Sequence, residues 1–130
     1  MSTLYTEIIQ DAYRHPTHRG ELESATRTFE DENPLCGDVL AIDLRVEDDT
    51  IRDARFHGRG CAISQASAEL LLDRVIGQRV DTALALEKDD ILAELGMPEI
   101  SPARLKCALL CLKVLKGAAY GLPSARVESG

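Results

Sequence analysis

The sequence predicts an α+β fold, because strand signals dominate its first half and helix signals its second half. The clearest strand signal is the alternation of apolar residues over 39–46. A turn signal at Asp48-Asp49 then connects this segment to a second apolar run over 51–56. From Cys61 onward the apolar residues follow the spacing of helices instead. We therefore expect a small antiparallel three-stranded sheet with helices packed on one face.

The first segment, residues 2–14, is predicted to be an amphipathic helix, since Leu4, Ile8 and Ala12 recur at helical spacing. The pair His15-Pro16 should end it, because a residue that precedes proline is disfavoured in the α region.

Three strands are expected next, at residues 25–29, 39–46 and 51–56, of which the first carries the weakest signal. The second strand should bury one face, which consists of Leu40, Ile42, Leu44 and Val46. The second and third strands form the predicted hairpin.

Helices are expected at 61–76, 81–86, 89–95 and from Ser101-Pro102 to about Tyr120. In the first of them, one side carries Cys61, Ser64, Ala68, Leu71, Leu72 and Val75. Ser as N-cap and Pro in the first turn mark the start of the last helix. Its buried side should contain Ala108, Leu112, Leu115 and Ala119, and its solvent side Lys106, Lys113 and Lys116. Cys107 should lie at the edge of the packed face.

The 130 residues are enough for one domain with an apolar core, which we place at residues 1–121, followed by a flexible tail at 122–130. The net charge of −7 and the absence of a basic stripe argue against a nucleic-acid partner. No run approaches the roughly 18 apolar residues of a membrane span, and the first residues do not resemble a signal peptide. We expect a cytoplasmic protein whose four cysteines bind metal or react, rather than form disulfides.

Three cysteines and one aspartate are the candidate functional residues: Cys36, Asp38, Cys61 and Cys107. Each cysteine lies where a turn or loop meets a regular element, and Cys61 follows two glycines at the predicted start of a helix, which favours the thiolate. Three thiols and a carboxylate can complete one tetrahedral metal site. The spacing matches no short zinc-finger pattern, so spacing alone leaves both a metal site and simple packing open. Cys111, nearer the core side of the last helix, is expected to be a packing residue.

Three motifs resemble the iron–sulfur scaffold family of the IscU, SufU and NifU N-terminal type. They are Asn33-Pro34-Leu35-Cys36-Gly37-Asp38, the segment from Gly58 to Ser67 that contains Gly60-Cys61, and Pro102-Ala103-Arg104-Leu105-Lys106-Cys107. The resemblance implies a metal site at an exposed end of the fold and a role in iron–sulfur cluster biogenesis. It also implies that Cys36, Asp38, Cys61 and Cys107 are the metal ligands.

The resemblance implies a cysteine desulfurase of the SufS or IscS type as sulfur donor, and downstream iron–sulfur carriers or apo-proteins as further partners. The acceptor of sulfane sulfur would be Cys36 as in the SufU branch, or Cys107 as in the IscU branch. Lys106 stands where IscU-type proteins carry a histidine, and the Arg-x-Lys-Cys motif is SufU-like. The extra segment of SufU proteins between the second and third cysteines is absent here, so the chain combines features of both branches.

Three functions follow as hypotheses. The chain is a zinc-dependent sulfur-transfer protein, a scaffold on which a [2Fe–2S] cluster is assembled, or a structural zinc-binding interaction domain. The carboxylate ligand and the glycine-rich turns argue against the third. Arg104 and Lys106 are candidate partner-binding residues, although a solvated surface role explains Arg104 equally well. His57 is expected on the surface rather than at the metal site, and Ser64 and Ser67 are expected to be packing residues.

Overall fold

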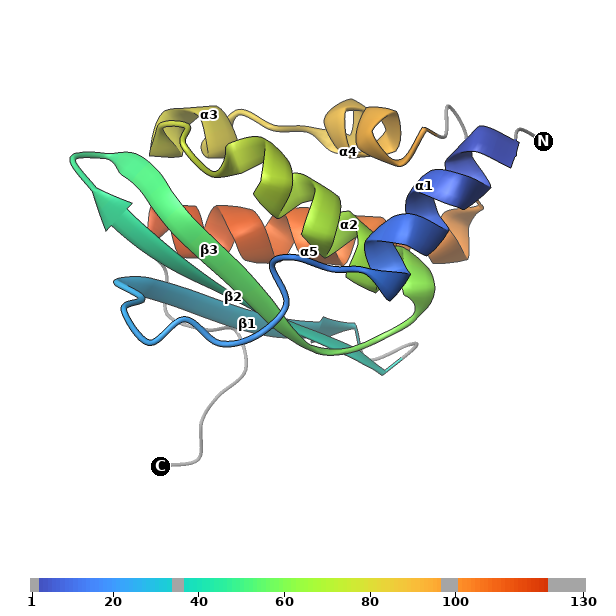
Figure 1. Cartoon of the computed structure of the whole chain (residues 1–130), viewed down its shortest axis with the longest axis horizontal. Coiled ribbons are helices and arrows are strands. Elements are labelled where there is room, and N and C mark those ends of the chain that lie inside the picture. The colour runs from blue at the N-terminus through green and yellow to red at the C-terminus, as the bar shows by residue number, and fades with distance from the viewer. Residues whose placement is uncertain (1–2, 34–36, 97–100, 122–130) are drawn as a thin grey trace.

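The computed structural model describes residues 3–33, 37–96 and 101–121. The predicted tail at 122–130 lies outside these residues. The helices and strands are α1 (Thr3–Arg14), β1 (Arg27–Asn33), β2 (Asp38–Glu47), β3 (Thr50–Arg59), α2 (Ala62–Val75), α3 (Val80–Leu84), α4 (Lys88–Leu95) and α5 (Pro102–Tyr120). Figure 1 shows one antiparallel sheet with helices on a single face, so the predicted α+β fold is confirmed.

The sheet has the strand order β1-β2-β3, and both neighbouring pairs are antiparallel. Asp48 and Asp49 form the predicted turn between β2 and β3, with positive φ angles of 53° and 59°. Two consecutive positive φ angles produce the type of turn that matches the twist of a two-residue hairpin. The charged pair therefore occupies a site where aspartate is one of the few residues other than glycine that are tolerated.

Strand β1 is longer at its C-terminal end than the sequence indicated, since it continues through the acidic residues Glu30, Asp31 and Glu32. All of β1 pairs with β2, from Arg27 opposite Leu44 onward. Asp31 is buried on the helix side of the sheet, where its carboxylate lies 2.6 Å from the ammonium group of Lys113 in α5. Long-range pairing thus maintains a strand in a segment whose local composition favours a loop.

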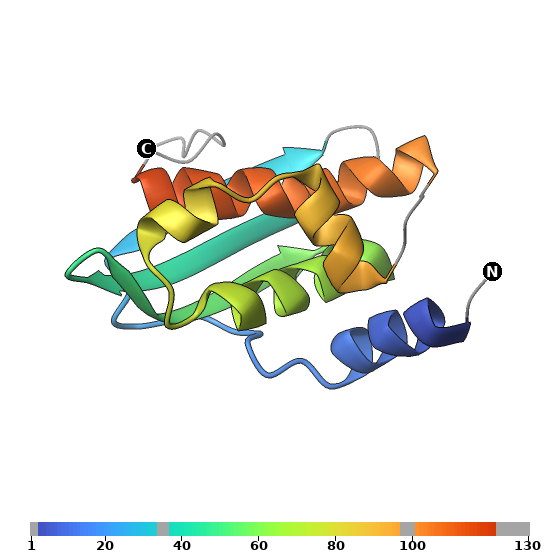
Figure 2. The ribbon, with the colours of Figure 1, turned by 90° about the horizontal axis from the view of Figure 1, so that it is seen from above.

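The helices form a layer on one face of the sheet. Helices α2 and α5 contact the sheet and each other (Figure 2). Helix α3 packs on α5, α4 packs on α2 and α5, and α1 packs against α2. Leu40, Ile42 and Leu44 point from β2 into this layer and are at most 1% exposed, as their alternation predicted. Among the described residues, no helix is both long and apolar enough to cross a membrane.

The sequence predicted that α2 is buried along one side, but the helix is buried on several sides. It contacts β3 of the sheet and the helices α1, α4 and α5. Its buried residues therefore include four polar ones: Ser64, Gln65, Ser67 and Glu69. Buried polar groups normally need hydrogen-bond partners.

Two of these polar side chains hold the loop that follows α1. The carboxylate of Glu69 accepts hydrogen bonds from Thr17 and His18, and Gln65 accepts one from Arg19. The same loop pairs with the outer edge of β3, since the Phe56 N–H donates to His18 O and the Gly20 N–H to Phe56 O, both at 2.8 Å. The connection from α1 to the sheet is thereby fixed on two sides.

Candidate metal centre

Asp38 is the first residue of β2, and the pleat of that strand determines where its side chain points. It shares the side of the strand with Leu40, Ile42 and Leu44, because side chains two residues apart lie on one face. Asp38 therefore faces the helix layer, where it is 4% exposed. Gly37 precedes it with a φ of 75°, and its N–H donates to Asn33 O at 2.8 Å. This hydrogen bond connects the ends of β1 and β2.

Cys61 is the N-cap of α2, in an extended backbone conformation, and it is exposed. Gly58 and Gly60 allow the chain to pass close to β2 just before it. A Cβ atom on Gly58 would lie 2.1 Å from Val39 O, and one on Gly60 would lie 3.1 Å from the Asp38 carboxyl carbon. The two glycines are therefore required for the close approach that brings Cys61 next to Asp38.

Cys107 lies in the second turn of α5 and is buried, with 6% exposure, although its position on the helix predicted only the edge of the packed face. Its thiol is 3.6 Å from the carbonyl oxygen of Ala103. Burial raises the pKa of the Cys107 thiol well above its ordinary value, and the neighbouring Cys61 and Asp38 raise this pKa further. Without a metal the Cys107 thiol is therefore protonated at neutral pH.

The fold brings Asp38, Cys61 and Cys107 together from three distant segments. One ligand atom from each residue lies within 4.8 Å of the other two, and Cys61 Sγ is 3.9 Å from Asp38 Oδ2. Zn–S bonds of about 2.3 Å place two sulfur ligands of a tetrahedral ion about 3.8 Å apart. The donor atoms present therefore fit a metal ion such as zinc in both kind and spacing.

Cys36, the fourth predicted ligand, lies outside the described residues, so its place at the site stays a prediction. Cys111 is fully buried in the apolar core, where burial raises the pKa of its thiol. The expectation that it is a packing residue agrees with this position.

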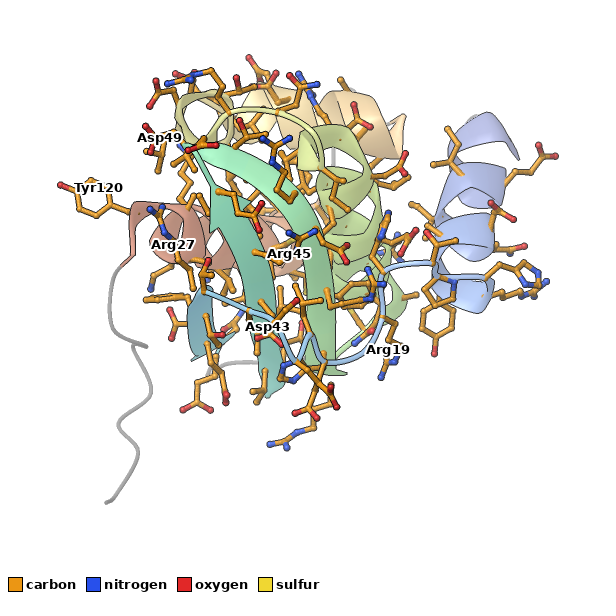
Figure 3. The ribbon with its side chains drawn as sticks, turned by 60° about the vertical axis from the view of Figure 1, so that its left-hand side comes forward. Arg19, Arg27, Asp43, Arg45, Asp49 and Tyr120 are labelled. Carbon is orange, nitrogen blue, oxygen red and sulfur yellow. The ribbon has the colours of Figure 1, made fainter. Side chains whose placement is uncertain are left out.

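His57 lies on the other face of the sheet, where it pairs with Asp43. The distance from His57 Nε2 to Asp43 Oδ2 is 3.5 Å. Figure 3 labels Asp43 on the sheet, together with Arg45. Asp43 alternates with the core residues of β2, so it belongs to the face that is turned away from α5. His57 is consequently not part of the cysteine cluster.

Arg104 and Lys106 are both exposed in the first turns of α5, three residues and one residue before Cys107. One further polar residue was not singled out as functional from the sequence. Ser64, in the first turn of α2, is buried against Gly60, next to Asp38. The serine three residues after Cys61 was the available signal, but its burial and its nearest neighbours became evident only in three dimensions.

The fold and this cluster define a class of protein: a small α+β domain that places two thiols and a carboxylate at the ends of its sheet and helices. Comparison with known proteins shows the particular family. Residues 4–128 match the model of the NifU-like N terminal domain. The chain therefore belongs to this family, and the resemblance inferred from its motifs is confirmed.

Two curated relatives and one solved structure show how similar the chain is to other members. It is 39% identical to the iron–sulfur cluster assembly scaffold protein IscU of Thermotoga maritima, over 88% of this chain and 92% of that protein. It is 34% identical to the zinc-dependent sulfurtransferase SufU of Bacillus subtilis, over 89% of each chain. The structure of FiSufU from Fervidobacterium islandicum AW-1 superimposes with a TM-score of 0.73, at 28% identity over 90% of this chain and 97% of the other.

Proposed function

We propose that this protein acts in iron–sulfur cluster biogenesis and accepts sulfane sulfur from a cysteine desulfurase at a zinc-binding site. The observation that carries the proposal is the convergence of Asp38, Cys61 and Cys107 within 4.8 Å. The proposal is also supported by the similarity of this chain to a protein named as a zinc-dependent sulfurtransferase and to a protein named as a cluster assembly scaffold.

In this proposal Asp38, Cys61 and Cys107 hold the metal, and Cys36 is the fourth ligand. Cys36 is separated from Asp38 in the sequence by Gly37 alone. A bound zinc ion would supply one chemical property, the stabilisation of the cysteines as thiolates at neutral pH. The buried Cys107 has the greatest need of this stabilisation, because burial raises the pKa of its thiol.

The sulfur-transfer step assigned to Cys36 is a thiol–persulfide exchange. Its thiolate attacks the terminal sulfur of the desulfurase persulfide, so that a new S–S bond forms on Cys36 and the S–S bond of the enzyme breaks. The desulfurase cysteine leaves as a thiolate, and the step needs no external oxidant or reductant. Cys107 is the alternative acceptor, but its 6% exposure favours a ligand role, since an attacking thiolate must be accessible.

A second candidate function is assembly of a [2Fe–2S] cluster on the same residues. Thiolates suit both zinc and iron–sulfur chemistry, so the donor set is compatible with either. The relatives named IscU favour this alternative. The cluster would then be the cargo of the protein, to be passed to downstream carriers or apo-proteins.

Arg104 and Lys106 are proposed to contact the desulfurase. Both are exposed beside Cys107 on a chain whose net charge is −7, so a local positive charge at this end offers a surface for acidic groups of a partner. The cytoplasmic compartment stays a prediction from the sequence.

The test combines metal analysis with a persulfide-transfer assay. Protein purified without added metal is analysed for zinc, iron and sulfide, and then incubated with a cysteine desulfurase and cysteine, after which persulfide on the protein is measured by mass spectrometry. Cys36→Ser should abolish transfer, whereas Cys111→Ala, which changes a buried thiol of the core, should retain it. Full transfer by Cys36→Ser would refute the assigned acceptor, and iron with sulfide in place of zinc would favour the cluster scaffold.

A further inference from the structure

Ser64 carries a buried hydroxyl group that has no hydrogen-bond partner among the described residues. The residue is 1% exposed, and its Oγ atom is shielded from solvent. A buried polar atom without a partner is destabilising, so in a native fold it needs an explanation. An unmet donor beside a candidate metal centre suggests that its partner changes when the site is filled.

The position of this hydroxyl group is defined by Gly60. A Cβ atom on Gly60 would lie 2.5 Å from Ser64 Oγ and 3.1 Å from the Asp38 carboxyl carbon. The hydroxyl and the carboxylate therefore flank the same small space, which exists because Gly60 has no side chain. A serine hydroxyl rotates freely about its C–O bond and can donate into that space.

The Asp38 carboxylate is the acceptor that the geometry offers to this hydroxyl group. Asp38 Oδ2 also lies 3.9 Å from the Cys61 thiol, so it belongs to the candidate metal centre. Metal-binding carboxylates usually accept a further hydrogen bond that fixes their orientation.

We propose that Ser64 is a positioning residue of the metal centre, which donates a hydrogen bond to the Asp38 carboxylate when the site holds a metal ion. This inference rests on the proposed metal-binding function and extends it to a residue outside the ligand set. Gly60 then has two roles, since it allows the chain to approach β2 and leaves the space between donor and acceptor open.

The experiment compares Ser64→Ala with Ser67→Ala. Ser67 is a matched control: it lies on the same helix, is 0% exposed, and also has a buried hydroxyl without a partner among the described residues. Zinc affinity is measured by competition with a chromophoric chelator. Ser64→Ala should weaken zinc binding by about tenfold or more, as loss of an outer hydrogen bond to a metal ligand does, while Ser67→Ala should bind as wild type does.

A double-mutant cycle with Asp38→Ala isolates the proposed contact. In the Asp38→Ala background the hydroxyl has no carboxylate to orient, so Ser64→Ala should cause no further loss of affinity. In the metal-free protein both serine variants should melt at or above the wild-type temperature, because each removes an unpaired buried hydroxyl and alanine is the better helix former. A loss of affinity without a loss of apo stability excludes a general folding defect.

Three results would overturn the inference: wild-type affinity in Ser64→Ala, an equal loss in Ser67→Ala, or an undiminished effect of Ser64→Ala in the Asp38→Ala background. These results are distinct from failure of the proposed function. If the wild-type protein binds neither zinc nor iron, both proposals fail. If the wild type binds zinc and the cycle shows no coupling, only the role of Ser64 is refuted.

Discussion

Glu69 connects α2 to the loop that follows α1, and its removal should destabilise the fold. Glu69 is 7% exposed, and its carboxylate accepts three hydrogen bonds. They come from the Thr17 N–H at 3.0 Å, the Thr17 hydroxyl at 2.7 Å and the His18 N–H at 2.9 Å. Glu69→Ala removes all three hydrogen bonds at once.

The size of the effect follows from these bonds. A hydrogen bond to a charged group contributes about 1.5–3 kcal/mol. Thr17 is exposed, so water can replace part of the interaction, and we take the low end of this range for each bond. Glu69→Ala should then lower the free energy of unfolding by about 4.5 kcal/mol, a large share of the total stability of a small domain.

Glu69→Gln separates the hydrogen bonds from the charge. Both backbone N–H groups donate to Oε1, which the amide oxygen of glutamine can replace. The amide NH₂ group can in turn donate to the Thr17 hydroxyl oxygen. This variant should therefore lose only about 1.5 kcal/mol, because each of the three bonds falls from about 1.5 to about 1 kcal/mol when its acceptor becomes neutral.

Urea denaturation of the metal-free protein measures both variants. Asp73→Ala is the control, because Asp73 lies one turn further along α2 with its side chain 76% exposed. Its replacement should change stability by no more than about 0.5 kcal/mol. If Glu69→Gln destabilised the protein as much as Glu69→Ala, the charge and not the hydrogen-bond pattern would be responsible, and the reasoning above would be refuted.

Two further predictions concern backbone geometry and pH. Gly58→Ala should lower the free energy of unfolding by about 3 kcal/mol, since its Cβ atom would lie 2.1 Å from Val39 O. Gly20 also has a positive φ, but a Cβ atom built there would have no neighbour within 4 Å. Gly20→Ala should therefore lower the free energy of unfolding by less in the same urea titration. Burial raises the pKa of the Cys111 thiol. Above the unfolded-state pKa of about 8.5, the thiol therefore stays protonated in the folded state and loses its proton in the unfolded state. The free energy of unfolding should consequently fall as the pH rises, by about 1.4 kcal/mol per pH unit. Cys111→Ala should reduce this slope in urea titrations between about pH 8 and 10, and an unchanged slope would contradict the assignment.

Local chemistry made α5 predictable to the residue. Ser101 caps its first turn by accepting from the Arg104 N–H, Pro102 follows at the first helical position, and Gly121 ends the helix in the left-handed conformation. The turn at Asp48-Asp49 is equally local. These signals depend on neighbouring residues alone, so a single sequence contains them in full.

The extent of β1 and the burial of Cys107 were less predictable, because both depend on distant partners. The acidic end of β1 is a strand because β2 pairs with it and Lys113 meets Asp31. Cys107 is buried by the docking of α5 against β1, β2 and α2, which no helical stripe specifies. The convergence of Asp38, Cys61 and Cys107 depends on the same docking, and motif resemblance rather than spacing indicated it from the sequence.

The pairing of residues 18–20 with β3 has a consequence for behaviour at high concentration. A sheet of three strands has two edges, and exposed edges can pair with other molecules and begin aggregation. The loop after α1 covers part of the β3 edge through the hydrogen bonds of Phe56. The other edge, β1, carries the consecutive acidic residues Glu30, Asp31 and Glu32. Asp31 is buried and paired with Lys113, so repulsion between two approaching copies would come from the flanking glutamates, and it would limit self-association through this strand.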